Sequence, residues 1–321
     1  MTSGTLSSPA GSASAAPAGE VPTPSRPVGI RRPGGIRRRD RIVGLLAVLP
    51  ALLIVVGFMA FPVAFAVFIS FTRTNGLTYE WRWFDNYIAL LNDPIVHQVF
   101  LNNLTFLISV PLVICTALIV SVLLFERVRG WKYFRIIFFL PNVLSVAVIG
   151  IMFRNAFGFN GGVNQALGVF GVEPIQFFTN GTTAIAIIIL ALVWAGFGFQ
   201  SLLLLAGLTS INPAVFEAAA IDGAGWWKRL WYITLPNIRR VLGFVFIINV
   251  LFTFSGLFGF VFVMTAGGPG FETTTIDYLV YLRAFSSSNL GSGAALAVVL
   301  FLFIGLLTLI QTRVFKLGAE D

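Results

Sequence analysis

Residues that carry reactive or metal-ligating chemistry are scarce in this sequence. It has one cysteine, Cys115, so no disulfide bond and no cysteine metal site can form within one chain. It has one histidine, His97, so neither a histidine cluster for a metal nor a Cys/His nucleophile is expected. Charged residues make up only 11% of the chain, against roughly 25% in soluble domains. The sequence therefore predicts an integral membrane protein rather than a soluble enzyme.

The apolar residues, 57% of the chain, are gathered into long runs without charge. A transmembrane helix needs ~20 predominantly apolar residues, and runs of this kind recur along the sequence. We predict an all-α polytopic membrane protein in which residues 41–316 form one membrane domain and residues 317–321 a short tail. The six transmembrane helices are expected at about 43–71, 100–125, 133–153, 183–207, 241–263 and 289–312.

Residues 1–40 differ from the rest in being rich in Ser, Ala, Pro, Gly and Arg. Such a segment cannot bury apolar surface, so we predict that it is disordered. Its arginines continue up to the first span, and a basic run in this position orients the protein or contacts anionic lipid rather than nucleic acid. We therefore predict a basic cytoplasmic tail that contacts membrane lipid.

The placement of the other basic residues tests the six-span prediction. Cytoplasmic loops carry an excess of Lys and Arg. One predicted face collects 17 of the 21 basic residues, from the N-terminal tail, Glu126–Arg135, the loop before the fifth span, and the C-terminus. The opposite face keeps only Arg73, Arg82, Arg154 and Arg283, and we expect Arg154 and Arg283 to anchor span ends at the membrane surface. Both termini are therefore predicted to be cytoplasmic.

One cytoplasmic loop, residues 209–239, has strong local signals for a helical hairpin. Asn212-Pro213 is typical of a helix N-cap followed by a proline in the first turn, and the alanines at 218–220 favour helix. Gly223 suits a helix end and a turn, and a second helix is expected from Gly225 to a stop before Pro236. A helix with an alanine surface can lie in the groove of another protein.

The same hairpin carries a known motif. Its EAAAIDGAGWWKRLWYITLP segment (217–236) resembles the EAA loop of permease subunits of bacterial binding-protein-dependent ABC importers, in the sugar branch of the maltose type. The segments 84–94, 135–141 and 266–269 are also similar to that family, so the resemblance covers roughly residues 42–316. Many relatives have a further proline a few residues after the Leu-Pro pair, which this chain lacks.

The resemblance implies a type I ABC importer permease fold in the bacterial plasma membrane. It also implies four kinds of partner: a second homologous permease subunit in a heterodimer, two ATPase subunits, an extracytoplasmic substrate-binding protein, and a carbohydrate substrate. ATP and Mg would bind to the ATPase, so no cofactor or metal is expected on this chain and no catalytic residue is predicted. The residues expected to couple to the ATPase are Phe216, Glu217, Ala218, Ala219, Asp222, Gly223 and Ala224.

Polar residues within a span face a cavity or another helix, because lipid cannot satisfy them. Asn249 and Thr253 lie four apart on one helical face, where they could contact a sugar or bond helices together, and both possibilities stay open. In the maltose-type permease the sugar lies between the fourth and fifth spans, and counting from the EAA motif implies further pathway positions. The predicted pathway residues are Leu192, Trp194, Ala195, Gly196, Phe199, Gln200, Asn249 and Thr253.

Two pathway positions depart from the maltose-type pattern: Leu192 replaces an amide and Phe199 replaces a tyrosine. This implies a pocket with fewer hydrogen bonds, so maltose is not indicated, and the sequence does not name the sugar. Glycerol-3-phosphate or another small polar solute is an alternative substrate, although no cation lies deep in a span. An ion-coupled secondary carrier is a weaker alternative, because such carriers bury acids at mid-membrane and none of the 13 acids lies there.

Overall fold

The computed structural model describes residues 38–315, with side chains from residue 46 onward. The predicted tail at 1–40 lies almost wholly outside the described residues, as does the tail at 317–321. The chain divides into two compact units, residues 1–56 and 57–321. The described part of the first unit is helical, and the sites discussed below lie in the second.

The described elements are almost all helices. From the first unit into the first half of the second they are α1 (Arg38–Val55), η1 (Val56–Ala60), α2 (Phe61–Ser70), β1 (Thr72–Thr74), β2 (Tyr79–Trp81), α3 (Asp85–Leu91), α4 (Pro94–Phe106), α5 (Ser109–Phe125), α6 (Trp131–Phe139), η2 (Leu140–Val143), α7 (Val146–Ala156) and α8 (Gly162–Val169). They continue with α9 (Gly181–Thr209), α10 (Pro213–Ile221), α11 (Trp226–Arg229), η3 (Leu230–Thr234), α12 (Leu235–Asn237), α13 (Arg239–Ser255), α14 (Phe258–Met264), α15 (Ile276–Tyr281), η4 (Leu282–Ser286) and α16 (Leu290–Val314).

The helices include the membrane spans expected of an all-α polytopic protein. Four stretches are long and apolar enough to cross a membrane: Leu46–Ser70, Pro94–Phe125, Gly181–Thr209 and Leu290–Val314. Two further pairs of helices pass the same test but are bent, by 98° between Val143 and Val146 and by 72° between Asn237 and Arg239. If each bent pair is one span, the total is six, as predicted.

Two predicted spans differ from the helices that form. The span at 133–153 is bent where Leu144 adopts an extended conformation and the Ser145 side chain caps α7. The span at 241–263 is broken, because α13 ends at Ser255 and α14 begins only at Phe258. Neither interruption was predicted, although Pro141, Asn142 and Ser145 lie at the first and Ser255 and Gly256 at the second.

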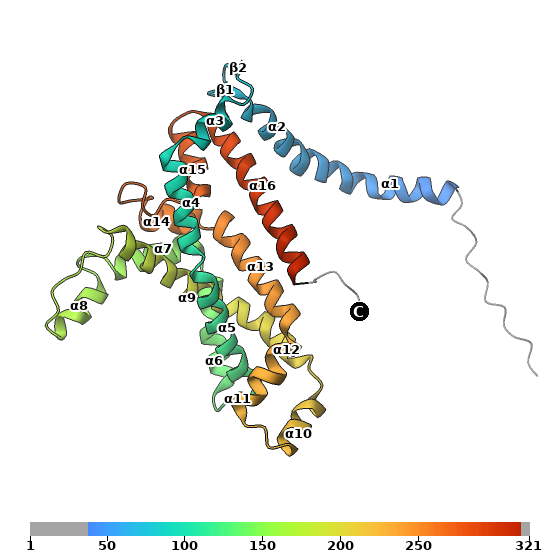
Figure 1. The fold of residues 1–321 in the computed structure, drawn as a ribbon, viewed down its shortest axis with the longest axis vertical. Coiled ribbons are helices and arrows are strands. Elements are labelled where there is room, and N and C mark those ends of the chain that lie inside the picture. The colour runs from blue at the N-terminus through green and yellow to red at the C-terminus, as the bar shows by residue number, and fades with distance from the viewer. Residues whose placement is uncertain (1–37, 316–321) are drawn as a thin grey trace, which may run out of the picture. The chain divides into compact units, whose positions relative to one another are not determined.

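Helix α9 lies at the centre of the second unit and packs along α5 (Figure 1). Its Gly198 lies directly against the backbone at the end of α6, and a Cβ atom at this position would come within 2.3 Å of the Phe138 carbonyl oxygen. Only glycine therefore allows α9 to approach so closely. Buried apolar clusters surround α9 near both of its ends, through residues such as Ile188 and Leu204.

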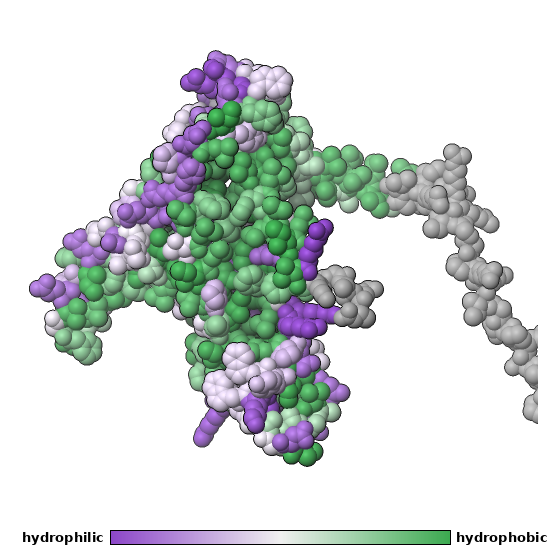
Figure 2. Space-filling model, in the orientation of Figure 1, coloured by the Kyte–Doolittle hydropathy of each residue, from purple (hydrophilic) through white to green (hydrophobic). Residues whose placement is uncertain are grey.

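The surface of the second unit has an apolar middle and polar ends. Figure 2 shows hydrophilic residues gathered over the β1–β2 hairpin at one end and over α10 and α11 at the other. Large apolar side chains are exposed between them, for example Ile136 on α6 and Leu302 on α16. An apolar surface of this extent is typical of contact with lipid or with another subunit.

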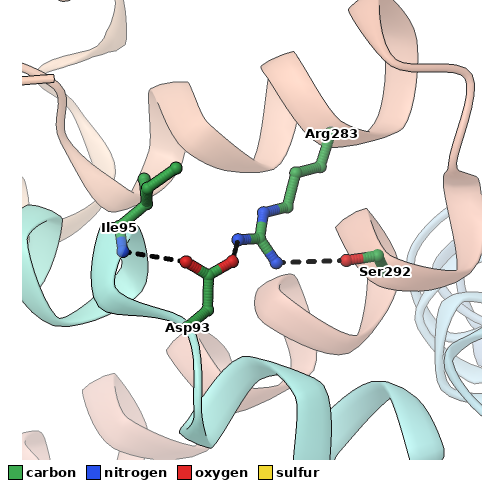
Figure 3. A network of polar contacts seen from close by, with 4 residues as sticks. All are labelled: Asp93, Ile95, Arg283 and Ser292. Atoms are coloured by element: carbon green, nitrogen blue, oxygen red, sulfur yellow. Dashed lines mark hydrogen bonds and ion pairs between the residues drawn. The ribbon is translucent and has the colours of Figure 1, made fainter. Parts of the chain in front are cut away.

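An ion pair at the end opposite the α10–α11 hairpin corrects one expectation. The Arg283 guanidinium binds the Asp93 carboxylate and donates to Ser292 Oγ at 3.2 Å, while Asp93 accepts from the Ile95 amide at 2.8 Å (Figure 3). The Arg283 side chain is only 16% exposed. It therefore joins the beginnings of α4 and α16 and does not extend to the membrane surface as an anchor, so that prediction was wrong for Arg283.

Candidate functional site

The inner hairpin, defined as residues 209–239, forms from the local signals noted in the sequence. Asn212 caps α10 by accepting from the Ala214 amide at 3.0 Å, and Pro213 occupies the first turn. The helix ends at a left-handed Gly223 with φ of +70°, and the Ala224 amide donates back to the Ala219 carbonyl at 2.9 Å. A residue with a Cβ atom would be strained at this φ.

The structure divides the predicted coupling residues into two faces of α10. Phe216 packs against Phe125 of α5, with ring centroids 5.7 Å apart, and Ala219 is buried. Exposed residues cover the other face and the turn: Glu217, Ala218, Ile221, Asp222 and Gly223. Phe216 and Ala219 therefore hold α10 to the bundle, and the exposed face is free to meet another protein.

The second half of the hairpin runs further than predicted. Instead of stopping before Pro236, the helical segment from Trp226 continues to Asn237. Proline lacks an N–H and collides with the carbonyl four residues earlier in a regular α-helix. Here the preceding residues, Leu230–Thr234, form a wider π-helical turn that accommodates it. The sharp bend of 72° comes after Asn237, where α13 begins.

One hydrogen bond ties the hairpin to a second inner segment. The Trp226 indole N–H donates to the Glu126 carboxylate at 2.6 Å, although the two residues are 100 positions apart. Both segments were predicted on the same face from their basic residues. Between them and the ends of α5 and α9 lies a pocket of about 450 Å³, which is lined by Glu126, Glu217 and Arg229 among mainly apolar residues.

A second cavity, the span cavity, lies between the helices and has a volume of about 320 Å³. It is walled by α9 and α13, with contributions from α5, α7, α14 and the turn at η2. The structure brings seven of the eight predicted pathway residues together here: Leu192, Ala195, Gly196, Phe199, Gln200, Asn249 and Thr253. Sequence reasoning missed Ser109, Asn142, Phe252 and Phe260, which also line it.

Trp194 is the predicted pathway residue that the structure places elsewhere. Its ring packs against Phe153 at 5.8 Å between centroids, within the apolar core. Leu192, Ala195 and Phe199 follow the spacing of one helical face, whereas Trp194 lies about 200° from Leu192 around the helix. The helical period alone could have excluded it from the pathway.

The polar groups of the span cavity are few and differ in what they bind. Asn249 donates to the Val245 carbonyl at 2.7 Å and Thr253 donates to the Asn249 carbonyl at 2.9 Å. Both bonds stay within α13, so these side chains do not join helices together through them. Gln200 is only 7% exposed, and its Oε1 atom has no hydrogen-bond partner among the described residues. A buried acceptor without a partner is costly unless something donates to it.

Comparison with known protein families identifies the class of protein to which this chain belongs. The model of the family described as binding-protein-dependent transport system inner membrane component matches residues 86–316. The chain belongs to this family. It is therefore a multi-pass protein of the plasma membrane and a permease subunit of an ABC transporter, a kind of subunit that is normally non-catalytic.

Individual relatives agree with this assignment. The permease is 33% identical to the sulfoquinovosyl glycerol transport system permease protein SmoG of Agrobacterium fabrum, over 86% of this chain and 91% of that protein. It is 33% identical to the multiple sugar-binding transport system permease protein MsmF of Streptococcus mutans, over 84% and 93%. It is 28% identical to the sn-glycerol-3-phosphate transport system permease protein UgpA of Brucella abortus, over 85% and 94%.

A solved structure supports the fold. The permease resembles a chain of a bacterial ABC transporter involved in the import of the acidic polysaccharide alginate, with a TM-score of 0.75. The match covers 88% of this chain and 97% of that chain at 21% identity. The type I importer arrangement implied by the EAA motif therefore has a structural counterpart.

Proposed function

We propose that this permease is one half of the translocation pathway of an ATP-driven importer that takes up a carbohydrate. The observation that carries the proposal is the span cavity, where a buried Gln200 acceptor, which has no hydrogen-bond partner among the described residues, lies among apolar and aromatic side chains. A sugar hydroxyl could donate to Gln200, and the rings of Phe199 and Phe252 could cover the C–H faces of the sugar. The names of the relatives SmoG and MsmF support a sugar substrate.

The proposed partners follow from the inner hairpin and the family. The exposed face of α10, with Glu217 and Asp222, would lie in a groove of an ATPase subunit, which would hold ATP and Mg. A second homologous permease would complete the pathway, and a second ATPase would serve its hairpin. An external binding protein would deliver the sugar. ATP binding would then move each hairpin and its bundle as a rigid body and open the pathway outward.

Glycerol-3-phosphate is the second candidate substrate, because UgpA is a relative. The residues that line the span cavity include no Lys, Arg or His. A phosphate dianion in such a cavity would lack a charged partner, which is costly in a low dielectric. The lining therefore favours a neutral substrate.

Uptake by the reconstituted complex tests the proposal. Proteoliposomes holding the permease pair and the ATPase, with loaded binding protein outside, should accumulate labelled sugar only when ATP is inside. Gln200→Leu should lower uptake about tenfold, since one hydrogen bond in a closed cavity is worth ~1.5 kcal/mol.

Gln311→Leu provides a matched control for this experiment. Gln311 on α16 is also buried, at 8% exposure, and its Oε1 also has no partner among the described residues, but it lies outside the span cavity. It should transport like the wild type. Equal losses in both variants, or uptake of glycerol-3-phosphate in preference to every sugar tested, would contradict the proposal.

A further inference from the structure

The break in the fifth span removes helical hydrogen bonds, including those that the Thr253 carbonyl and the Phe258 amide would make. In a continuous helix the Thr253 carbonyl would accept from residue 257, and the Phe258 amide would donate to residue 254. One side of the break is enclosed by the protein, since Thr253, Phe254 and Leu257 are at most 2% exposed, whereas Ser255 is exposed and Phe258 is half-buried. Buried backbone groups need protein partners in place of water, and side chains supply them here.

Two polar side chains from distant segments supply the missing partners. Asn103 on α4 donates to the Thr253 carbonyl at 2.8 Å, across 150 positions of sequence. Asp277 on α15 accepts from the Phe258 amide at 2.7 Å. Asn103 is fully buried, so its amide has no alternative partner in solvent.

The same side chains also hold the outer loop, which we define as residues 265–275. Asn103 Oδ1 accepts from the Ile276 amide at 2.9 Å, directly after the loop. The neighbouring Asn102 donates to the Phe271 and Thr274 carbonyls at 2.7 and 2.9 Å. Asp277 accepts in addition from Thr275 and from the Tyr278 amide. Burial raises the pKa of the Asp277 carboxyl, while these donors and the Phe258 amide act to lower it.

Both the nitrogen and the oxygen of the Asn103 side-chain amide therefore have hydrogen-bond partners, and these partners lie in two different parts of the protein. Its nitrogen binds the helix whose last turns line the span cavity through Asn249 and Thr253. Its oxygen binds the end of the outer loop, which the sequence predicts on the outer side of the membrane. The loop also lines a wide surface pocket of about 630 Å³ together with Arg154 and Asn160.

We propose that Asn102, Asn103 and Asp277 form an outer latch, a set of positioning residues that makes the outer loop and the span-cavity wall move as one unit. Contact of the external binding protein with the outer loop would then be transmitted to Thr253 and Asn249. The latch rests on the proposed transport function, because it gives that function a mechanical connection between the outer face and the cavity.

Hydrogen–deuterium exchange of the purified permease in detergent tests the physical connection. Asn103→Ala should speed exchange about tenfold in both the end of α13 and residues 271–278, because it removes a partner from each. Thr105→Val is the matched control on the same helix, since within residues 38–315 its hydroxyl donates only to the Leu101 carbonyl of its own helix. Faster exchange in one of the two segments alone, or in neither, would overturn the latch.

ATP hydrolysis by the full complex tests the transmission. In the Asn103→Ala complex the ratio of activity with loaded binding protein to basal activity should fall about fivefold, with basal activity unchanged. Asn102→Ala should lower the ratio less, because it loosens only the loop. If the Asn103→Ala complex fails to assemble, the ratio measured for the Asn102→Ala complex tests the latch instead.

The two tests separate this inference from the proposed function. A wild-type complex that neither imports sugar nor responds to a binding protein would refute the proposed function, and exchange would still decide whether the latch exists. A wild-type complex that responds normally, beside Asn103→Ala and Asn102→Ala complexes with unchanged ratios, would refute the latch alone.

Discussion

The cap and turn of the inner hairpin and the break in the fifth span obtain the partners of their backbone groups in opposite ways. In the hairpin, Asn212 caps its own helix two residues on, and Gly223 closes the turn by bonds within five residues. At the break, the Thr253 carbonyl and the Phe258 amide depend on side chains from other segments. The hairpin can therefore change partners at its exposed face without disturbing the bundle, whereas the break cannot move without the outer loop. A permease that transmits motion needs both kinds of element.

The largest effect on uptake is expected from Gly223→Pro, which should prevent the hairpin from transmitting motion to the span cavity. Proline cannot adopt the φ of +70° found here, and it removes the amide that donates to the Ala220 carbonyl. The cost is ~3 kcal/mol, so ATP-driven uptake should fall at least about a hundredfold. The protein should still insert into the membrane, because the change lies outside the spans.

Gly225→Ala is the control for the hairpin. Gly225 has a φ of −63°, and nothing lies within 4 Å of the position of a Cβ atom. Uptake should stay at the wild-type level. If Gly223→Pro transported as well as Gly225→Ala, the hairpin turn would have no role in coupling.

The next largest effect is expected from Gly198→Ala, which tests the packing of α9 against the last residues of α6. The added Cβ would lie 2.3 Å from the Phe138 carbonyl oxygen, so the helices must separate. Overpacking of this kind costs ~1–3 kcal/mol and should lower the unfolding temperature in detergent.

The same substitution two residues earlier should have little effect on stability. At Gly196 the new Cβ would meet only Val113, at an ordinary 3.5 Å, and would point towards the span cavity. A Gly196→Ala protein that unfolded as early as Gly198→Ala would show that the close approach is not specific to Gly198.

The smallest effect is expected from Trp226→Phe, which removes the hydrogen bond to Glu126 and keeps an aromatic ring. Both residues are exposed, so water replaces much of the lost interaction. The free energy of unfolding should fall by ~0.5–1 kcal/mol, and uptake should change less than twofold. Glu126→Gln keeps an acceptor and should change uptake less than Trp226→Phe does. A larger loss of uptake in Glu126→Gln than in Trp226→Phe would indicate a role for the charge of Glu126.

Several structural features that we did not predict nevertheless had signals in the sequence. The β1–β2 hairpin, in which Thr72 pairs with Trp81, surrounds an Asn75-Gly76 turn of the kind that favours two-stranded hairpins. Asn102 and Asn103 are an amide pair inside an apolar run, and buried amides there need partners. Nothing in the sequence says which groups they bind, because Ile276 and Thr253 lie 150 or more residues away.

Local and periodic physics therefore determined much of this permease from sequence alone: the membrane class, the expected spans, and the capped α10 with its turn. Those features depend on residues within a few turns of one another. The resemblance to the maltose-type permeases added most of the seven predicted residues that line the span cavity, five on α9 and two on α13. The tertiary structure decided how the fifth span breaks, where Arg283 lies, and how Asn103 joins the outer loop to the cavity wall. Each of these depends on a partner distant in sequence, and hydropathy contains no information about such pairs.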